Sequence, residues 1–348
     1  MILPKYINVP AAWKGVDMRQ NPGRWIYSLA IDEIAELKKA ADDFLFSGGD
    51  IGSLKISDFP LPTFGLKLKN LQETLTKRIG FQLIKGLPID QYGIETTAAI
   101  FCGIGSHLGF ARSQNAKGHI LGHVKDLGIK LDDPNTRIYQ TTERQSFHTD
   151  SCDVVGLLCL IEAKEGGLSL LASTVTIYNE IQKHRPDLIN YLFDPVSTDR
   201  RGEVPEGQKP YFNIPILNWY EDLLTGIYQR TYIQSASRFP DSIQLSKEHL
   251  EAIDLFDEIA NEPDIHLSMQ LKPGDMQFVY NHSLLHDRTG FTDWPEVENR
   301  RHLLRLWLAM PGDRELPEVF KQRYGSIEIS NRGGIITHNT RLHVSLTP

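Results

Sequence analysis

The sequence predicts a single α+β domain in which helices flank an antiparallel β-sandwich or barrel. From about residue 147 onward, short apolar runs are separated by turn residues, a spacing typical of antiparallel β-architectures. The first third of the chain mixes helical and strand patterns instead. No internal repeat or low-complexity linker divides the 348 residues, so one domain with a large core is the simplest organisation.

The first third predicts three helical segments and one strand. Residues 31–44 carry apolar side chains at helical spacing with charged residues opposite, and Gly48 follows as a stop. Residues 71–75 are also helical in pattern. The run at 80–88 is a short apolar stretch closed by Gly and Pro, which predicts a buried strand. A further helix is expected over 96–107.

The β-rich part follows. Strands are expected at 154–161, 169–172, 227–233, 267–271, 276–280 and 302–310. Two helices interrupt them, at 176–184 and 246–260, and Ser246 is a suitable N-cap for the second. From Asp313 onward the chain turns polar, which fits a lid, an oligomer arm or a tail and leaves a homo-oligomer open.

The composition excludes several classes of function. With 37 Lys and Arg against 44 Asp and Glu, the formal net charge of −7 gives no long-range attraction to nucleic acid or to an anionic membrane surface. The longest apolar stretch, at 154–161, is far shorter than the roughly 20 residues needed to cross a bilayer. The first residues lack the apolar segment of a secretory signal, so we expect a cytoplasmic protein that acts on a small molecule. The three cysteines cannot all pair and form no metal-finger pattern.

A candidate metal site starts at Phe147-His148-Thr149-Asp150, just before the strand at 154–161. Residues i and i+2 of an extended segment point to the same side, so His148 and Asp150 can present an imidazole nitrogen and a carboxylate oxygen to one point. Such a pair alone is more often a surface histidine hydrogen-bonded to an aspartate. A distant His282 or His286 can complete it, however, and two histidines with one carboxylate are typical of non-haem Fe(II) oxygenases.

Two arginines in the last expected strand predict an anionic ligand. Arg301 and Arg305 share one face of that strand and are surrounded by leucines and a tryptophan. Because unpaired buried charge is costly and guanidinium binds carboxylate through two parallel hydrogen bonds, the pair is expected to line a cavity. The alternative is a surface ladder paired with Glu296 and Glu298, which fits Arg300 better than the other two arginines.

These elements together resemble a known family. The motifs HTD, EGGLS, PGD…NH…LHDRTGF and RRHLLRLWL occur in the order typical of the taurine dioxygenase-like (TauD/TfdA) Fe(II)/2-oxoglutarate-dependent oxygenases, the group that includes the γ-butyrobetaine and clavaminate enzymes. The resemblance covers about residues 60–310. It implies a double-stranded β-helix, the jelly-roll core of clavaminate synthase-like proteins, with flanking helices and a polar C-terminal extension at 313–348.

The resemblance also implies roles for individual residues. The implied iron ligands and catalytic residues are His148, Asp150 and His286. Arg301 would bind the far carboxylate of 2-oxoglutarate, and Arg305 would lie near its metal-chelating carboxylate and the edge of the substrate. Ser169 stands where the family has a threonine hydroxyl that assists the distal arginine.

The choice between His286 and His282 as the third ligand rests on the residues that follow. The family's ligand histidine is followed by x-Arg-x-x-Phe, which residues 287–291 match after His286. His282 is then expected to support a ligand or to lie in the core.

The resemblance implies Fe(II) as cofactor and 2-oxoglutarate and O2 as co-substrates, which are converted to succinate and CO2 while an unactivated C–H bond of the primary substrate is oxidised. Candidate substrate residues are Gln114 and Asn115 in the loop at 111–118, and Arg230 and Tyr232 in the strand expected at 227–233. Each could equally be loop scaffold or solvated surface. Their character favours a small polar molecule, amino-acid-like or carboxylated, with hydroxylation as the default outcome and desaturation or cyclisation left open.

Two other classes stay open on the sequence alone. A zinc-dependent hydrolase also uses three ligands and an open position, but it has no use for two arginines facing a dicarboxylate, and no general-base glutamate stands beside the histidines. A non-catalytic small-molecule-binding barrel is the other alternative, although all three candidate ligands are present. Measurements of metal content and of oxygen-dependent 2-oxoglutarate turnover distinguish the oxygenase, the zinc hydrolase and the binding barrel.

Overall fold

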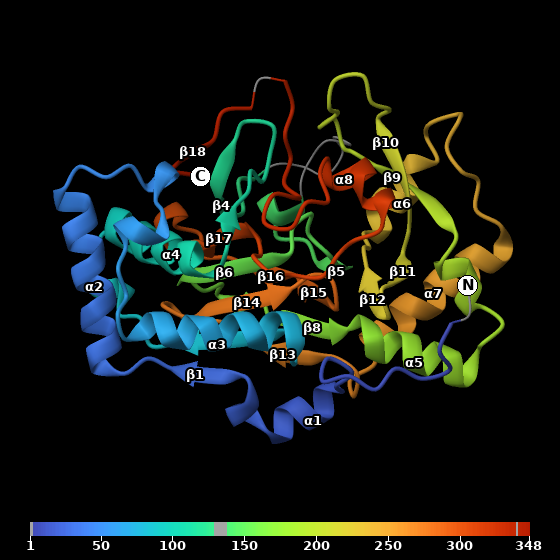
Figure 1. Cartoon of the computed structure of the whole chain (residues 1–348), viewed down its shortest axis with the longest axis horizontal. Coiled ribbons are helices and arrows are strands. Elements are labelled where there is room, and N and C mark those ends of the chain that lie inside the picture. The colour runs from blue at the N-terminus through green and yellow to red at the C-terminus, as the bar shows by residue number, and fades with distance from the viewer. Residues whose placement is uncertain (1–2, 129–137, 339) are drawn as a thin grey trace.

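Two largely antiparallel β-sheets face each other at the centre of the protein (Figure 1). The computed structural model describes residues 3–128, 138–338 and 340–348. The strands of the larger sheet are β1 (Ile26–Ser28), β2 (Phe81–Lys85), β3 (Phe110–Ala111), β4 (His119–Lys125), β6 (Val154–Ile161), β14 (Met276–Tyr280), β17 (His302–Ala309) and β18 (His343–Val344). Their order is β1-β2-β14-β6-β17-β4-β18, and β3 pairs with β17.

The smaller sheet holds four strands in the order β13-β8-β15-β5. These strands are β5 (Gln145–His148), β8 (Ser169–Ser173), β13 (Leu267–Met269) and β15 (Leu284–Arg288). Three two-stranded ribbons extend from the core: β7 (Glu165–Gly166) with β16 (Phe291–Thr292), β9 (Pro195–Asp199) with β10 (Tyr211–Pro215), and β11 (Leu217–Tyr220) with β12 (Leu223–Gly226). The two facing sheets confirm the expected α+β architecture.

Alternation of side chains along the strands explains this arrangement. In β17, Leu304 and Leu306 belong to the core cluster formed with the helices, whereas Leu303 and Trp307 belong to the cluster between the two sheets. Successive residues of a strand point to opposite faces, so one apolar strand serves both clusters. The inward-facing row is also the one that can deliver polar side chains into the space between the sheets.

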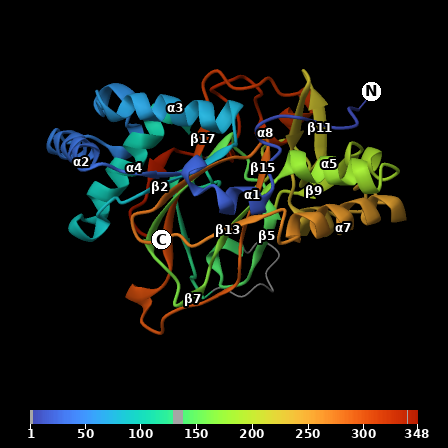
Figure 2. The same cartoon turned by 90° about the horizontal axis from the view of Figure 1, so that it is seen from below.

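Helices cover the outer faces of both sheets (Figure 2). The α-helices in the described part of the chain are α1 (Gly15–Gln20), α2 (Ile31–Phe46), α3 (Phe64–Lys77), α4 (Ile94–Leu108), α5 (Thr174–His184), α6 (Arg230–Ala236), α7 (Lys247–Asn261) and α8 (Lys321–Tyr324). Helices α2, α3 and α4 pack on the larger sheet, and α5 and α7 on the smaller one. Ser173 and Ser246 cap α5 and α7 by accepting hydrogen bonds from backbone N–H groups, which confirms the expected cap of the later helix.

One expected strand is wrong. The run at 227–233 forms an isolated β-bridge between Gln229 and His148 and then turns into α6. Tyr228 and Ile233 are buried all the same. A short apolar run fits a helix or a strand equally well, and here packing against α7 and the smaller sheet decides.

The polar C-terminal segment, residues 313–348, lies against the core rather than away from it. Strand β18 pairs with β4 (Figure 1), and the side chain of Arg332 is completely buried. The backbone N–H of Gly334 donates to the carbonyl of Ser151, and that of Ile335 to Ser113. The segment therefore forms part of the wall around the site described below.

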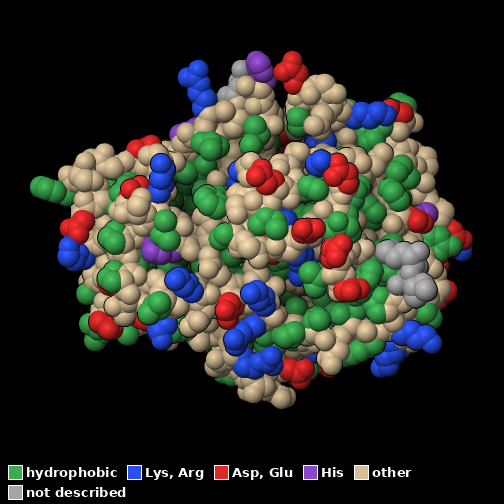
Figure 3. Space-filling model, viewed as in Figure 1, with side chains coloured by type: hydrophobic (Ala, Val, Ile, Leu, Met, Phe, Trp, Pro, Cys, Tyr) green, Lys and Arg blue, Asp and Glu red, His purple; other side chains and the backbone are tan. Residues whose placement is uncertain are grey.

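In the part of the chain that the structure describes, no helix has the length and apolar character needed to span a membrane. Lysine and arginine side chains are intermingled with aspartate and glutamate on the face shown in Figure 3.

Candidate active site

Two histidines and an aspartate converge between the sheets. His148 ends β5 and His286 lies on β15, and the antiparallel register of these strands pairs the two residues directly. Their ring centroids are 4.1 Å apart. Asp150 lies 3.9 Å from Nε2 of His148 through Oδ1 and 3.7 Å from Nε2 of His286 through Oδ2. One potential ligand atom from each residue lies within 4.8 Å of the others, close enough to hold one metal ion.

The electrostatics of this cluster suit a metal. Burial, together with the nearby His286, lowers the pKa of His148 to about 3, so its imidazole is neutral and can offer a lone pair. Nδ1 of His148 contacts the carbonyl oxygen of Ser146 at 2.8 Å, and its Nε2 contacts the side-chain amide nitrogen of Gln145 at 2.9 Å and lies 3.9 Å from Asp150. Burial works against the charge on Asp150, but Arg305 and the two histidines outweigh it and lower the pKa of this carboxyl.

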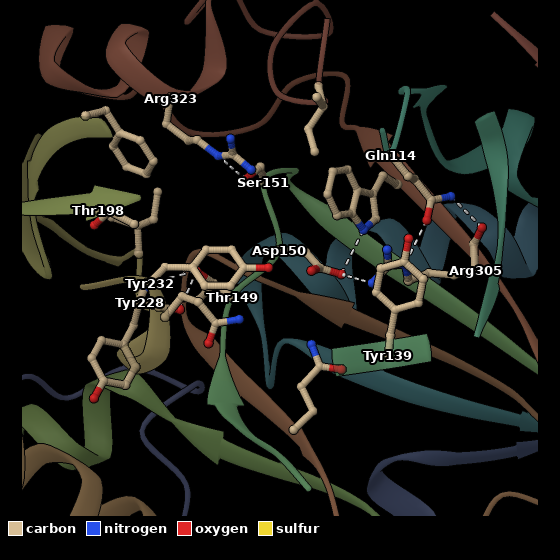
Figure 4. Close-up of a pocket in the computed structure, with 16 residues that line it drawn as sticks. Gln114, Tyr139, Thr149, Asp150, Ser151, Thr198, Tyr228, Tyr232, Arg305 and Arg323 are labelled. Carbon is tan, nitrogen blue, oxygen red and sulfur yellow. Dashed lines mark hydrogen bonds and ion pairs between the residues drawn. The ribbon is translucent and has the colours of Figure 1, made fainter. Parts of the chain in front are cut away.

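Two β17 side chains orient Asp150. Trp307 donates from Nε1 to Oδ2 of Asp150 at 2.7 Å, and Arg305 approaches the same oxygen through Nη1 at 3.2 Å (Figure 4). The backbone N–H of Asp150 donates to Oδ1 of Asn281 at 3.0 Å. These contacts hold the carboxylate in place before any ion binds.

A cavity beside the three candidate ligands contains the expected arginine pair and a third arginine. Its walls include His148, His286, Ser169, Arg288, Arg301 and Arg305, with apolar side chains from β4, β6 and β17. Arg301 is 5% exposed, and its Nη1 is buried without a hydrogen-bond partner. Burial lowers the pKa of Arg301 to about 10, as expected for a guanidinium that lacks an anion.

The neighbours of Arg301 leave it room for a ligand. Gly167 adopts a positive φ of 66°, and a Cβ there would lie 3.0 Å from Nε of Arg301. Ser169 lines the same cavity and donates its hydroxyl to Gln277 at 3.0 Å. Arg288 is held by the carbonyl oxygens of Thr141 and Glu143, which are neutral acceptors. Two guanidinium groups therefore face a buried space that fits a carboxylate.

Arg305 is fixed by Gln114, a residue 191 positions away. Nε of Arg305 donates to Oε1 of Gln114 at 2.7 Å, and Nε2 of Gln114 donates back to the carbonyl oxygen of Arg305 at 2.7 Å. The guanidinium also lies between the rings of Tyr139 and Trp307, 4.8 and 5.0 Å from their centroids. Gln114 therefore positions Arg305, which in turn orients Asp150.

Loss of the hydrogen bonds between Gln114 and Arg305 should weaken turnover. In Gln114→Leu, Nε of Arg305 is left buried without its acceptor, so we expect kcat/KM for 2-oxoglutarate to fall about tenfold. Asn115→Ala is the matched control, since the Asn115 side chain only accepts a long 3.4 Å hydrogen bond from the backbone of His119. Steady-state succinate formation by both variants checks this. An equal loss of kcat/KM in the two variants would contradict this positioning role of Gln114.

The four candidate substrate residues are placed differently. Gln114 and Tyr232 line the pocket next to Asp150, together with Thr149, Tyr228 and Gln145 (Figure 4). Arg230 is not in that wall: it lies at the start of α6 and forms ion pairs with Asp254 at 2.6 Å and Asp257 at 3.3 Å. Asn115 is not in the wall either and sits in the turn before β4.

Sequence reasoning missed several contributors. Trp307, Asn281 and Tyr139 surround Asp150 and Arg305, and Arg288 joins Arg301. Trp307 could have been predicted from the sequence, because it lies two residues after Arg305 and therefore on the same face of the strand. Asn281 and Tyr139 could not have been predicted, since their contacts depend on tertiary packing.

His282 does not belong to this cluster. It lies in the turn between β14 and β15, fully buried, with Nε2 2.7 Å from Oδ1 of Asp153. Asp153 and Asp313 are bridged by Arg332, at 2.7 and 2.8 Å. The guanidinium fills the space among these acids, which makes the cluster a charge network rather than an open metal site.

Comparisons with known proteins agree with this geometry. Residues 47–307 match the family "Taurine catabolism dioxygenase TauD, TfdA family". The chain is 31% identical to FR-33289 synthase of Streptomyces rubellomurinus over 320 residues, covering 91% of this chain and 94% of that protein. It is 30% identical to a taurine hydroxylase-like protein of Stachybotrys chartarum over 334 residues, covering 90% of this chain and 85% of that protein.

The fold also matches solved structures. Asparagine oxygenase in complex with Fe(II), 2S,3S-3-hydroxyasparagine and succinate superposes with a TM-score of 0.64 at 15% sequence identity, covering 82% of this chain and 93% of that chain. This likeness confirms the expected double-stranded β-helix core. Because the family match spans most of the sequence and two relatives match nearly all of it, the chain belongs to the TauD/TfdA family of Fe(II)/2-oxoglutarate-dependent oxygenases.

Proposed function

We propose that His148, Asp150 and His286 bind the Fe(II) that enzymes of this family use, and that Arg301 binds the far carboxylate of 2-oxoglutarate. The observation that carries the proposal is the buried, unpartnered Nη1 of Arg301 in a cavity that also contains both histidines. A neutral His148 and an ionised Asp150 are the protonation states that metal ligation requires. Three arginines in the cavity favour an oxygenase over a zinc hydrolase, and the complete ligand set favours it over a binding barrel.

The protein's own groups prepare this reaction. Bound iron with 2-oxoglutarate and dioxygen supplies the oxidation of an unactivated C–H bond, with release of succinate and CO2. Arg305 and Trp307 hold the Asp150 carboxylate, while Ser169 and Arg288 complete the wall around Arg301. Apolar side chains such as Leu157, Leu271 and Leu303 exclude water from the cavity.

The primary substrate is proposed to be a small polar metabolite, amino-acid-like or carboxylated, with hydroxylation as the default outcome. Tyr232, Gln145 and Thr149 line the pocket beside Asp150 and offer an aromatic face, an amide and a hydroxyl. The asparagine oxygenase structure holds a hydroxylated amino acid, so amino acids come first in a substrate screen. We infer a cytoplasmic location, and assign the segment at 313–348 to the same domain as residues 60–310.

A substrate screen tests the function as a whole. Purified protein with Fe(II), ascorbate and 2-oxoglutarate is incubated with a metabolite mixture, and mass spectrometry follows succinate and products 16 mass units heavier, the increment of one oxygen atom. We expect oxygen-dependent succinate formation that a substrate accelerates. Zinc in place of iron, or no 2-oxoglutarate consumption with any mixture, would contradict the proposal.

Arg301→Ala is expected to raise the 2-oxoglutarate concentration needed for turnover by roughly 30-fold or more. A charge-assisted bidentate pair in a water-poor cavity is worth about 2–5 kcal/mol when one partner is truncated. Arg301→Lys should recover only part, because an ammonium lacks the planar fork. Both variants are compared with the wild type by their KM for 2-oxoglutarate. Arg300→Ala is the matched neighbour and should leave that KM within twofold, so an equal effect in both would remove Arg301 from the co-substrate site.

A further inference from the structure

A second cavity opens beside the pocket that faces Asp150. It has a volume of about 350 Å³, and Arg323 and Ile335 belong to the walls of both. Three arginines line it, Arg112, Arg200 and Arg323, and among the described residues in its wall Glu203 is the one carboxylate. The wall therefore carries an excess of positive charge in a protein whose overall charge is −7.

Arg200 and Arg323 are held close together. Both lie near the ring of Phe212, whose centroid is 5.1 Å from the guanidinium carbon of Arg200 and 5.5 Å from that of Arg323. Arg200 is 4% exposed and donates to neutral oxygens, the carbonyls of Lys209 and Gln322 and the amide of Gln208. Burial and the charge of Arg323 lower the pKa of Arg200 to about 10. Burying the Arg200 guanidinium beside a second cation is unfavourable in free energy, and an anion bound next to it would offset part of that penalty.

Arg112 lines the same cavity. Its Nε donates to the carbonyl oxygen of Gly333 and its Nη1 to the side-chain oxygen of Asn331, both at 3.1 Å. Both acceptors are neutral, and burial lowers the pKa of Arg112. The segment at 331–334 thereby fixes this guanidinium at the cavity without neutralising it.

Arg323 links the cavity to the proposed iron site. It extends from α8, and its Nε donates to Oγ of Ser151 at 2.6 Å (Figure 4). Ser151 directly follows Asp150 in the chain, so the guanidinium lies one residue from a proposed metal ligand. A molecule held by Arg323 can extend into the pocket lined by Tyr232 and Asp150.

We propose that Arg112, Arg200 and Arg323 bind an oxyanion carried by the primary substrate, a phosphonate, phosphate or carboxylate group, while the carbon to be oxidised lies beside Asp150. This inference rests on the proposed function, because it places the substrate relative to the iron. Planar guanidinium groups in the lining of one cavity suit a group with several oxygen atoms. Arg301 and Arg288 are separate from this set, since they line the cavity proposed for the co-substrate, which contains His148 and His286, and neither belongs to the wall of the second cavity.

Calorimetric titration tests the site with three small probes of similar size: methylphosphonate, acetate and acetamide. The protein is loaded anaerobically with Fe(II) and saturated with 2-oxoglutarate, so that Arg301 is already occupied. We expect the anions to bind and acetamide not to bind. Arg323→Gln and Arg112→Gln should each weaken anion binding about tenfold or more. Arg185→Gln is the matched control, because that arginine is exposed and pairs with Asp187 and Glu251 away from the cavity.

The comparison of methylphosphonate with acetate separates a phosphonate or phosphate group from a carboxylate, according to which probe binds more strongly. Equal affinity of wild type, Arg323→Gln and Arg112→Gln for both anions would overturn the inference, as would equal binding of acetamide. Iron content and 2-oxoglutarate binding of the same wild-type sample report separately on the proposed function. A sample that binds iron and 2-oxoglutarate but shows no arginine-dependent anion binding contradicts this inference alone.

Discussion

His286→Ala is expected to abolish both stoichiometric Fe(II) binding and 2-oxoglutarate turnover while the protein stays folded. The side chain is paired with His148 across two strands and lines the cavity between the sheets, so its removal takes away one of the three proposed ligands without opening the main core. His148→Ala should behave in the same way. Metal analysis of anaerobically loaded protein and succinate formation measure the effect, and circular dichroism checks the fold.

His282→Gln is the control that separates the two histidines. His282 contacts Asp153 at 2.7 Å and lies outside the ligand cluster, so this variant should lose thermal stability yet keep one iron per folded chain. The opposite pattern, with iron retained in His286→Ala and lost in His282→Gln, would reverse the ligand assignment.

Arg332→Met is expected to destabilise the whole protein by about 3–5 kcal/mol, because it leaves two buried carboxylates without their cation. Arg332 is completely buried and bridges Asp153 and Asp313, and its Nη1 also donates to the carbonyl of Arg314 at 2.7 Å. Denaturant unfolding measures the change in free energy. The loss should extend to substrate-stimulated turnover, since the same segment supplies Ile335 to the pocket wall.

Two further variants distinguish lost charge pairing from lost packing. Combining Arg332→Met with Asp153→Asn and Asp313→Asn removes the unpaired charges and should recover part of the stability. Arg341→Ala changes an exposed arginine of the same C-terminal segment and should alter the free energy of unfolding by less than about 0.5 kcal/mol. If Arg332→Met were as stable as Arg341→Ala, the network would not anchor the segment.

Much of the candidate site could be predicted from the sequence, because successive side chains of a strand alternate between its two faces. His148 and Asp150 flank one residue, and Arg301 and Arg305 are four apart, so each pair shares a face wherever the backbone is extended. The leucines of β17 on the opposite face follow the same rule. Helix α7 and its Ser246 cap were predictable for a similar local reason.

Contacts between distant residues were not predictable in this way. Gln114 and Arg305 are 191 positions apart, and nothing local to either residue indicates that each satisfies the other. Arg230 looked available for a substrate, but its two aspartate partners belong to α7, which packs beside α6 only in the folded chain. The polar character of residues 313–348 gave no sign that Arg332 would be the largest fully buried side chain.

The sequence by itself determined the fold class, the family and the residue types of the proposed iron and co-substrate sites, because strand alternation and motif order are local properties of the chain. The tertiary structure decided which residues meet. The register of β15 against β5 sets His286 opposite His148, whereas the turn after β14 directs His282 to Asp153. It also brought α8 and the C-terminal segment to the pocket that Asp150 lines, and it placed Arg323 with Arg112 and Arg200 in the wall of the neighbouring cavity. Such contacts depend on loop closure and packing between distant segments, which no local pattern encodes.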